Sequence, residues 1–354
     1  TRWLSDWSSD VCSSDLDRRV EMAKRVVSGV RPTGRLHLGN YVGTLQNWVK
    51  LQNSPEFDCF YFVADWHSLT TGYERANEIG SNLMNIFMDL LAIGIDPDKA
   101  VLFLQSSVPG HSELFLIYSM ITPMGWLERN PTVKEMVRDY DLKEQVNFGL
   151  LGYPVLQAAD ITLYKGEYVP IGKDQLPHLE LTREIVRRFQ NLYGNVFPEP
   201  QELLTEHPVL KGLDGRRMSK TLGNTIPVIS SKEEVWEAVK NAVTDPARVY
   251  KTDPGHPDVC NVYHYFQSFF QKEAKEFCIS EECSKGAIGC MDCKRRLSEL
   301  LSNMLDPFYQ KKQSFLNEVS KVREVIMEGN KKANLVAHQT IEEIKAIFQF
   351  TVNP

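Results

Sequence analysis

The sequence lacks long apolar runs and any excess of basic charge. Among its 354 residues the longest apolar candidate, residues 83–95, is interrupted by Asn85 and Asp89. A membrane-spanning helix needs about 20 predominantly apolar residues, so we expect no membrane span. The formal net charge of −6 argues against a protein that coats nucleic acid non-specifically, because such binding needs dense lysine and arginine.

Cysteine is scarce in the first half of the chain, and most of the seven cysteines lie towards the other end. A basic segment followed by an apolar stretch, as in secretory signals, is also missing, so we expect a cytoplasmic protein with reduced thiols. In that setting metal ligation is a better interpretation of clustered cysteines than disulfide bonding.

Two local runs of basic residues remain despite the acidic balance. They comprise Lys294, Arg295 and Arg296, and later Lys331 with Lys332. Each run predicts either a patch that binds nucleic acid or a solvated helix face.

Residues 1–19 differ from the rest of the chain. They repeat Ser-Asp pairs and show neither helical nor strand periodicity. We interpret them, with Cys12, as a disordered tail or an artefact and leave them out of the fold prediction.

From residue 25 onward the pattern predicts an α/β domain. Apolar runs typical of buried strands alternate with amphipathic, helical stretches. Strands are predicted at residues 26–30, 59–63, 101–104 and 168–171, and helices at residues 41–51 and 77–93. Ligands of such doubly wound parallel sheets bind at the carboxyl ends of the strands. The segments expected there are residues 32–40, 65–67 and 105–110.

The chain is predicted to divide into two domains. Residues 20–226 form a Rossmann-like domain, whose alternation is interrupted by a helical insertion at about residues 111–153 that could mediate oligomer contacts. Residues 227–354 form an all-α domain, which begins with Ser231 and Glu234 at the spacing of a capping box.

Two loops carry the strongest chemical signals. Residues 32–40, between the first strand and helix, combine glycines with His37 and Asn40, which suits either phosphate binding or a simple capped turn. Residues 215–221 form a basic loop in which Lys220 could stabilise a leaving pyrophosphate, unless the loop is only a basic linker.

Together these loops resemble the HIGH and KMSKS signatures of class I aminoacyl-tRNA synthetases. The surrounding segments resemble the bacterial tryptophanyl-tRNA synthetases at residues 28–34, 153–160, 172–175 and 242–246. Three positions depart from the signatures, namely Asn40 for the second His, Arg217 for the first Lys and Thr221 for the last Ser.

The resemblance implies an ATP site. Lys220, His37 and Asn40 would be catalytic, and Gly172 with Asp174 would hold the ribose. The complete set of implied ATP-binding residues is Arg31, Pro32, Thr33, Gly39, Asn40, Gly172, Lys173, Asp174, Val209, Arg217, Met218, Ser219, Lys220 and Thr221.

A second set of residues predicts an amino-acid pocket. Tyr153, Gln157 and Asp160 share one face of a predicted helix, and Asp160 has apolar neighbours in which a carboxylate needs a donor. That donor could be an indole N–H or a local partner. The resemblance implies that Asp160 binds the indole nitrogen and that Tyr153 and Gln175 contact the amino group. His67, Val169 and Ile171 would shape the ring pocket.

Four cysteines have the order Cys-x22-Cys-x6-Cys-x2-Cys, namely Cys260, Cys283, Cys290 and Cys293. Four thiolates suit zinc and iron–sulfur clusters alike. The resemblance to a subset of bacterial tryptophanyl-tRNA synthetases favours a [4Fe-4S] cluster over Zn²⁺. Such a cluster would brace a surface for the tRNA anticodon. Cys59 and Cys278 lie outside the pattern.

The resemblance thus implies that a homodimeric enzyme activates L-tryptophan with ATP and Mg²⁺ and then transfers it to tRNA(Trp). A tyrosyl-tRNA synthetase and an inactive, RNA-binding paralogue are the alternatives.

Overall fold

The computed structural model describes residues 23–139, 146–204 and 210–350. The predicted tail at residues 1–19 and the predicted ATP-binding residue Val209 lie outside the described residues.

The centre of the fold is a five-stranded sheet with the order β3-β2-β1-β4-β5. All four pairs of neighbouring strands are parallel. The strands are β1 (Lys24–Val30), β2 (Phe57–Val63), β3 (Ala100–Leu104), β4 (Tyr168–Ile171) and β5 (Gln201–Leu204). The order reverses between β1 and β4, which in open α/β sheets marks the ligand-binding crevice. The predicted fold class is therefore confirmed.

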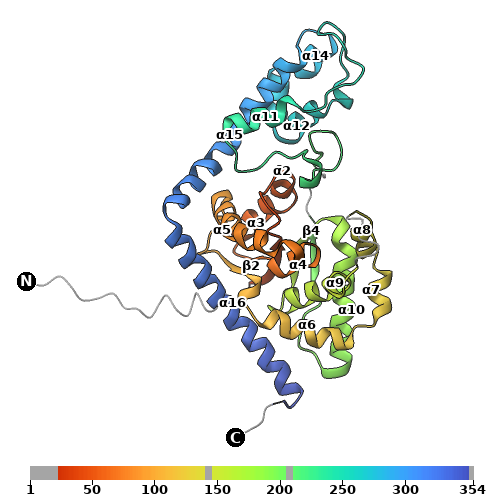
Figure 1. Ribbon diagram of the computed structural model, residues 1–354, viewed down its shortest axis with the longest axis vertical. Helices are drawn as coiled ribbons and strands as arrows, with labels where there is room; N and C mark the ends of the chain where they lie inside the picture. The colour runs from red at the N-terminus through yellow and green to blue at the C-terminus, as the bar shows by residue number, and fades with distance from the viewer. Residues whose placement is uncertain (1–22, 140–145, 205–209, 351–354) are drawn as a thin grey trace, which may run out of the picture.

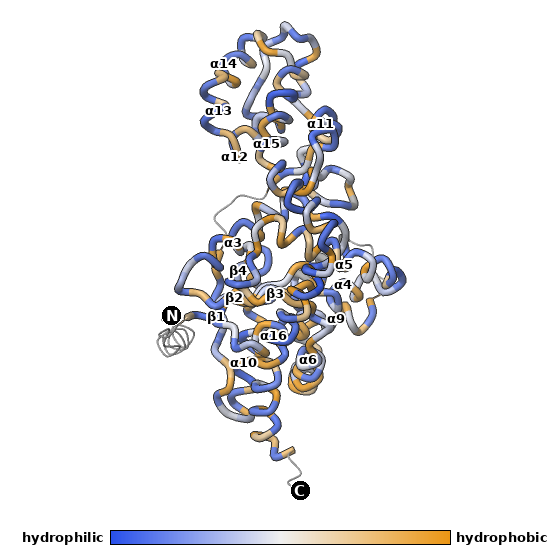
Figure 2. Tube along the Cα trace, turned by 90° about the vertical axis from the view of Figure 1, so that its left-hand side faces the viewer, coloured by the Kyte–Doolittle hydropathy of each residue, from blue (hydrophilic) through white to orange (hydrophobic). Residues whose placement is uncertain are grey.

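Helices cover both faces of this sheet because its strands are apolar on both sides. Neighbouring residues of β1 show this, since Val26 belongs to one hydrophobic core and Val27 to the other. Figure 2 shows apolar residues gathered along the central strands, whereas the outer helices mix polar and apolar residues. The helices and helical turns of this part follow in chain order: α2 (Leu38–Asn40), η1 (Tyr41–Leu45), α3 (Gln46–Gln52), α4 (Asp65–Gly72), η2 (Tyr73–Arg75), α5 (Ala76–Ile93), η3 (Gln105–Ser107), α6 (Gly110–Ile121), α7 (Met124–Arg129), α8 (Pro131–Asp139), α9 (Phe148–Thr162), η4 (Lys173–Gln175) and α10 (Leu176–Tyr193).

The described chain after residue 226 is helical. The predicted capping box is present, because Ser231 Oγ accepts from the Glu234 N–H and the Glu234 carboxylate accepts from the Ser231 N–H. The helices and helical turns from the second signature loop onward are η5 (Lys220–Leu222), α11 (Lys232–Lys240), η6 (Pro257–Val259), α12 (Asn261–Phe269), α13 (Gln271–Glu276), α14 (Ile279–Ser284), α15 (Cys290–Asn317) and α16 (Val319–Ile347).

The last helix returns to the sheet. α15 leads away from the upper helical region, and α16 continues down the side of the molecule to β3 (Figure 1). There Asn330 Oδ1 accepts a 2.9 Å hydrogen bond from the Leu104 N–H, and Asn334 Nδ2 donates to Ser107 O at 2.9 Å. α16 therefore covers the edge strand of the sheet.

Gly329 sets how closely α16 approaches β3. A Cβ built at this residue would lie 1.9 Å from the backbone oxygen of Leu102. We expect Gly329→Ala to lower the free energy of unfolding by about 3 kcal/mol, because either the helix or the strand must move. Urea denaturation measures this, with Gly80→Ala on α5 as the matched control. Gly80 has open space around it, so its replacement should be neutral or stabilise by up to about 1 kcal/mol. Equal effects of the two changes would contradict the close packing.

Candidate active site

The two signature loops lie in contact at the carboxyl end of β1. Lys220 Nζ donates to the backbone oxygens of Thr33 at 3.2 Å and Gly34 at 3.0 Å. The Gly39 N–H lies 3.2 Å from Met218 Sδ. Segments about 180 residues apart in the sequence thus form one surface.

His37 and Asn40 cap each other at the start of α2. The Asn40 N–H donates to His37 Nδ1 at 3.3 Å, and the His37 N–H donates to Asn40 Oδ1 at 3.1 Å. His37 Nδ1 is therefore an acceptor, which places the proton of the neutral ring on Nε2. Burial, reinforced by Lys220, lowers the pKa of His37 to about 4. His37 is thus a neutral donor at physiological pH.

Lys220 in the second loop also has a strongly lowered pKa. Burial lowers the pKa of Lys220 to about 8, with Asp89 opposing the change and Arg31 adding to it. Burial in a cleft together with a shifted pKa is common at catalytic sites. The ammonium of Lys220 donates to two backbone carbonyls, those of Thr33 and Gly34.

We expect kcat/KM for ATP to fall above about pH 8, because free Lys220 loses its proton there. A bound triphosphate favours the ammonium form, so kcat should stay constant to higher pH. Rates at limiting and at saturating ATP between pH 6 and 10 measure both quantities. A value of kcat/KM that is constant up to pH 9.5 would contradict the assignment.

The same shift affects stability with a definite sign. The folded pKa lies below the ordinary value of 10.5, so the unfolded chain holds the proton more tightly. The charged lysine therefore costs stability below pH 8, and this cost disappears as the pH rises from about 8 towards 10.5.

A buried carboxylate lies at the centre of the second predicted site. Asp160 on α9 is 1% exposed and accepts hydrogen bonds from three side chains. The donors are His67 Nε2 at 2.7 Å, His111 Nδ1 at 2.7 Å and Gln105 Nε2 at 2.8 Å. These interactions outweigh the effect of burial and lower the pKa of Asp160 to about 2. The group is therefore an ionised acceptor at any physiological pH.

Of the remaining predicted tryptophan-binding residues, Tyr153 has a contact that leads to this carboxylate, through the ring of His67. The ring of Tyr153 lies 6.4 Å from that of His67, and its hydroxyl bonds His178 Nε2 at 2.5 Å. Gln157, from the same helix, is only partly buried. Val169 and Ile171 on β4 are buried in one small apolar cluster.

The predicted ribose turn is a short helical turn at the reversal of the strand order. Gly172 N-caps η4, and a Cβ built there would lie 2.6 Å from Asp174 Oδ1. Gln175 Nε2 donates to Asp174 Oδ2 at 3.1 Å. Arg217 of the second loop lies 4.0 Å from the same carboxylate. The turn and the basic loop thus face each other.

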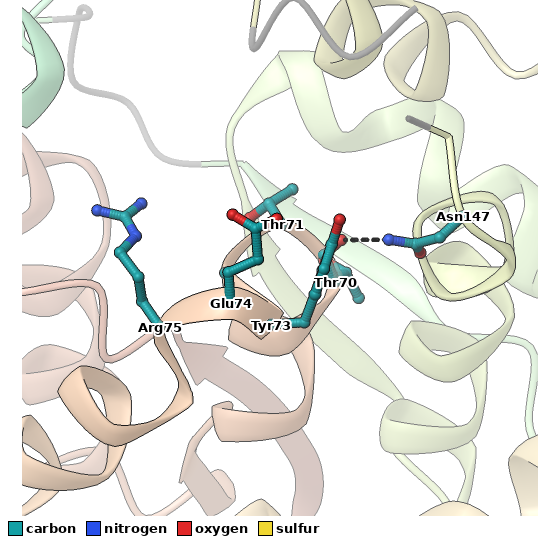
Figure 3. A pocket seen from close by; sticks show the side chains of 7 residues that line it. Thr70, Thr71, Tyr73, Glu74, Arg75 and Asn147 are labelled. Carbon is teal, nitrogen blue, oxygen red and sulfur yellow. Dashed lines mark hydrogen bonds between the residues drawn. The ribbon is translucent and has the colours of Figure 1, made fainter. Parts of the chain in front are cut away.

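Other predicted ATP-binding residues lie nearby. Arg31 donates to Thr71 Oγ1 at 2.7 Å. A pocket next to this contact, at the end of α4, is shown in Figure 3 and includes a hydrogen bond from Asn147 Nδ2 to Thr70 O. None of the predicted site residues lines it; its lining is Thr70, Thr71, Gly72, Tyr73, Glu74, Arg75 and Asn147.

Sequence reasoning gave no role to three residues of the carboxylate site, Gln105, His111 and Tyr164. Gln105 directly follows β3 and lies in the segment 105–110 expected at the ligand-binding edge, but nothing in the sequence links it to Asp160. His111 opens the predicted insertion, where nothing in the sequence links it to Asp160. Tyr164 bonds His111 Nε2 through its hydroxyl at 2.8 Å.

The four predicted cysteine ligands approach one another at the start of α15. Arg248 Nη1 lies 3.7 Å from Cys283 Sγ and 3.8 Å from Cys290 Sγ. Burial raises the pKa of Cys293 to about 12, and the thiols of Cys260, Cys283 and Cys290 add to the rise. Within the described residues, however, no three His, Cys, Asp or Glu side chains lie close enough to hold a single metal ion.

The prediction that Lys294 belongs to a basic surface patch is wrong. Lys294 is 8% exposed and donates to the backbone oxygen of Lys240 at 2.8 Å, so it supports the fold rather than a surface. Arg295 and Arg296 are exposed and lie over the rings of Trp236 and Phe277.

The parallel sheet, the reversal beside β1 and the two joined loops define a class I nucleotide-dependent synthetase. A family model described as tRNA synthetases class I (W and Y) matches residues 21–306. The chain belongs to this family.

Curated relatives agree over nearly their whole length. The tryptophan–tRNA ligase of Thermotoga maritima is 47% identical over 321 residues, which cover 91% of this chain and 98% of the relative. That of Aquifex aeolicus is 41% identical, with 91% and 98% covered. The tryptophanyl-tRNA synthetase structure from Campylobacter jejuni, complexed with ADP and tryptophan, has a TM-score of 0.83 at 32% identity and covers 92% of this chain and 99% of that one.

These similarities confirm the predicted enzyme class and the predicted function, tryptophan–tRNA ligation. Among the described helices, none is both long and apolar enough to cross a membrane. The cytoplasmic location stays a prediction.

Proposed function

We propose that the chain activates L-tryptophan at the crevice between β1 and β4 and then charges tRNA(Trp). The carboxylate oxygen of tryptophan attacks the α-phosphorus of ATP, the bond to the β-phosphate oxygen breaks, and tryptophanyl-adenylate and pyrophosphate form. A terminal ribose hydroxyl of the tRNA then attacks the acyl carbon and AMP leaves. The observation that carries the proposal is the contact of both signature loops at the carboxyl end of β1, the edge of the parallel sheet from which His67 and Gln105 also reach the buried carboxylate of Asp160.

Lys220 and His37 would stabilise charge on the phosphates. The ammonium of Lys220 now bonds backbone carbonyls at the end of β1, and phosphate oxygens would be stronger acceptors for it. His37 can donate from Nε2 without carrying a charge. Mg²⁺ would arrive with the triphosphate, as is usual for nucleotide enzymes. Catalysis then consists of positioning and charge stabilisation, with no covalent enzyme intermediate.

The remaining ATP contacts are proposed from the positions that match the family's motifs. Asp174 beside Arg217 would accept from the ribose hydroxyls, and Gly172 leaves room for the turn. Arg31, Lys173 and the neighbouring loop residues would complete the site.

Asp160 would accept the indole N–H of the substrate. Tyr153 and Gln175 would contact the amino group, while Gln157, Val169 and Ile171 border the ring. A site built to hydrogen-bond a polar group of its substrate rejects analogues that lack this group by about 10⁴-fold or more.

Tryptophan-dependent exchange of pyrophosphate into ATP tests the proposal. Exchange that is faster with tyrosine would favour the tyrosyl alternative, and no exchange with either would favour an inactive RNA-binding protein.

A homodimer is proposed from the apolar surface of the insertion. Leu116 and Met120 occupy one face of α6 and are 56% and 74% exposed. Met124 at the start of α7 and Phe148 at the start of α9 are half or more exposed as well. Exposed apolar side chains concentrated on neighbouring elements are typical of an interface.

A [4Fe-4S] cluster on the four cysteines is proposed from their chemistry. Zinc, with all four sulfurs about 2.3 Å from one metal ion, is the alternative for the same four thiolates. In a [4Fe-4S] cluster each thiolate binds a different iron, so the sulfurs lie further apart. Arg248 offers a positive donor to two of the thiols, and Gly255 leaves the space that Cys283 Sγ occupies, since a Cβ there would lie 2.5 Å away. The cluster would hold α14 and the start of α15 together.

Cys290→Ser is expected to abolish iron binding and the brown colour of the protein and to lower its melting temperature by roughly 5 to 10 °C. The KM for tRNA should rise, while tryptophan-dependent pyrophosphate exchange should persist, because the catalytic loops belong to the other part of the fold. Cys278→Ser is the matched control, since this exposed thiol lies outside the set. Unchanged stability and unchanged tRNA charging in the Cys290 variant would refute the bracing role.

A further inference from the structure

The three donors to Asp160 divide unequally between its two oxygens. Oδ1 accepts from both Gln105 Nε2 and His111 Nδ1, whereas among the described residues Oδ2 accepts only from His67 Nε2. An ionised carboxylate has about four acceptor positions, two on each oxygen. Oδ1 is therefore saturated by the protein, and Oδ2 keeps one free position.

The free position lies on the more open side of the carboxylate. His67, the partner of Oδ2, is 11% exposed, whereas the two partners of Oδ1 are fully buried. A substrate entering the site therefore reaches Oδ2 first.

His111 is itself fixed on its other side. Its Nε2 lies 2.8 Å from the Tyr164 hydroxyl, and its ring stacks at 27° to that of Phe103. A carboxylate only accepts, so Nδ1 carries a proton and donates to Asp160. Burial, with Asp160 adding to it, raises the pKa of Tyr164 well above its ordinary value, so the hydroxyl keeps its proton. Tyr164, His111 and Asp160 thus form one buried chain of hydrogen bonds, in which His111 is held at both ring nitrogens.

We propose that His111, supported by Tyr164, is a positioning residue that occupies Oδ1 and leaves Oδ2 as the only acceptor for the indole N–H. This inference rests on the role of Asp160 proposed above and extends it to a residue that does not touch the substrate. Without the His111 donor the carboxylate has a second free position and is less fixed. The indole N–H then meets an acceptor whose orientation is wrong for it.

The test compares L-tryptophan with β-(benzo[b]thiophen-3-yl)-L-alanine, in which sulfur replaces the indole N–H. Pyrophosphate exchange gives kcat and KM for both amino acids. The preference is the ratio of kcat/KM for tryptophan to kcat/KM for the sulfur analogue. We expect His111→Leu to lower this ratio at least 10-fold by raising KM for tryptophan. The values of kcat and the KM for the sulfur analogue should change less than about 3-fold. His111→Asn, whose amide nitrogen can take the place of Nδ1, should restore most of the preference. Tyr164→Phe should have a smaller effect of the same sign.

Tyr118→Phe is the matched control. It removes another buried tyrosine hydroxyl, one that bonds Thr162 Oγ1 at 2.8 Å and has no bond to Asp160 or His111. It should leave the preference unchanged. A melting curve shows whether the His111→Leu variant is folded. If the folded variant raises KM equally for tryptophan and for the sulfur analogue, His111 has only a structural role and the inference is wrong.

Two further outcomes separate this inference from the proposed function. A wild-type enzyme that uses both amino acids equally well would overturn the acceptor role of Asp160 itself. Gln105 Oε1 has no hydrogen-bond partner among the described residues, so it is the alternative acceptor for the indole N–H. If Gln105→Met lost the preference for tryptophan and Asp160→Asn kept it, Gln105 would be the acceptor. The proposed role of Asp160 and the inference about His111 would then both be wrong.

Discussion

Asp160→Asn is expected to reduce kcat/KM for tryptophan about 10³-fold or more, with the KM for ATP nearly unchanged. The amide supplies an N–H₂ group where His67, His111 and Gln105 already donate, so at least one buried donor loses its acceptor. The substrate N–H also loses a charged acceptor, and hydrogen bonds to charged groups are the strong ones. Steady-state pyrophosphate exchange with varied tryptophan measures the effect.

The control for this change is Asp245→Asn. Asp245 is another buried carboxylate paired with a histidine, His256, at 2.8 Å, but it lies near the cysteines. It should affect stability and leave tryptophan activation intact. A tryptophan KM that is equal in both variants would exclude Asp160 from substrate binding.

Because the pKa of Asp160 is about 2, below the ordinary 3.8, its stabilising effect is complete above about pH 4 and is lost as the pH falls towards 2.

Lys220→Met is expected to lower kcat for adenylate formation by about 10²- to 10³-fold, while the affinity for tryptophan is kept. Removing one preorganised charge from a developing anion typically costs this much. Single-turnover formation of tryptophanyl-adenylate measures the chemical step, and fluorescence titration measures tryptophan binding.

Arg216→Met provides the comparison within the same loop. Arg216 is exposed, and its side chain bonds only Asp214 among the described residues, so its loss should change the rate less than about 3-fold. If both variants were equally slow, the effect would come from the net charge of the loop, and Lys220 would have no special role.

Much of the sheet could be predicted because its strands are short apolar runs between loop residues. β5 could not, because Gln201–Leu204 is a half-exposed edge strand without that pattern. The loops of the ATP site were recognisable because their residues are contiguous. The donors to Asp160 come from separate segments after β2 and β3, and only the parallel pairing of the strands brings their ends together.

Charge patterns were less reliable than apolar ones. Lys294 looked like part of a surface patch, but its stem is buried and its ammonium bonds a backbone carbonyl. The packing of α16 against β3 could not be predicted either. The amphipathic pattern of α16 indicates that one face is buried, but not against which element. The roles of Gly329 and Asn330 are visible only in the structure, where both lie against β3.

The docking of α16 has a consequence for fragments of this enzyme. The N–H of Leu104 finds its acceptor on a helix encoded more than 200 residues later, so the nucleotide-binding half is not self-sufficient as a stretch of sequence. A polypeptide ending before α16 presents β3 as a bare strand to other copies of itself, which is a template for aggregation. During synthesis this edge stays unprotected until the ribosome has released almost the entire chain.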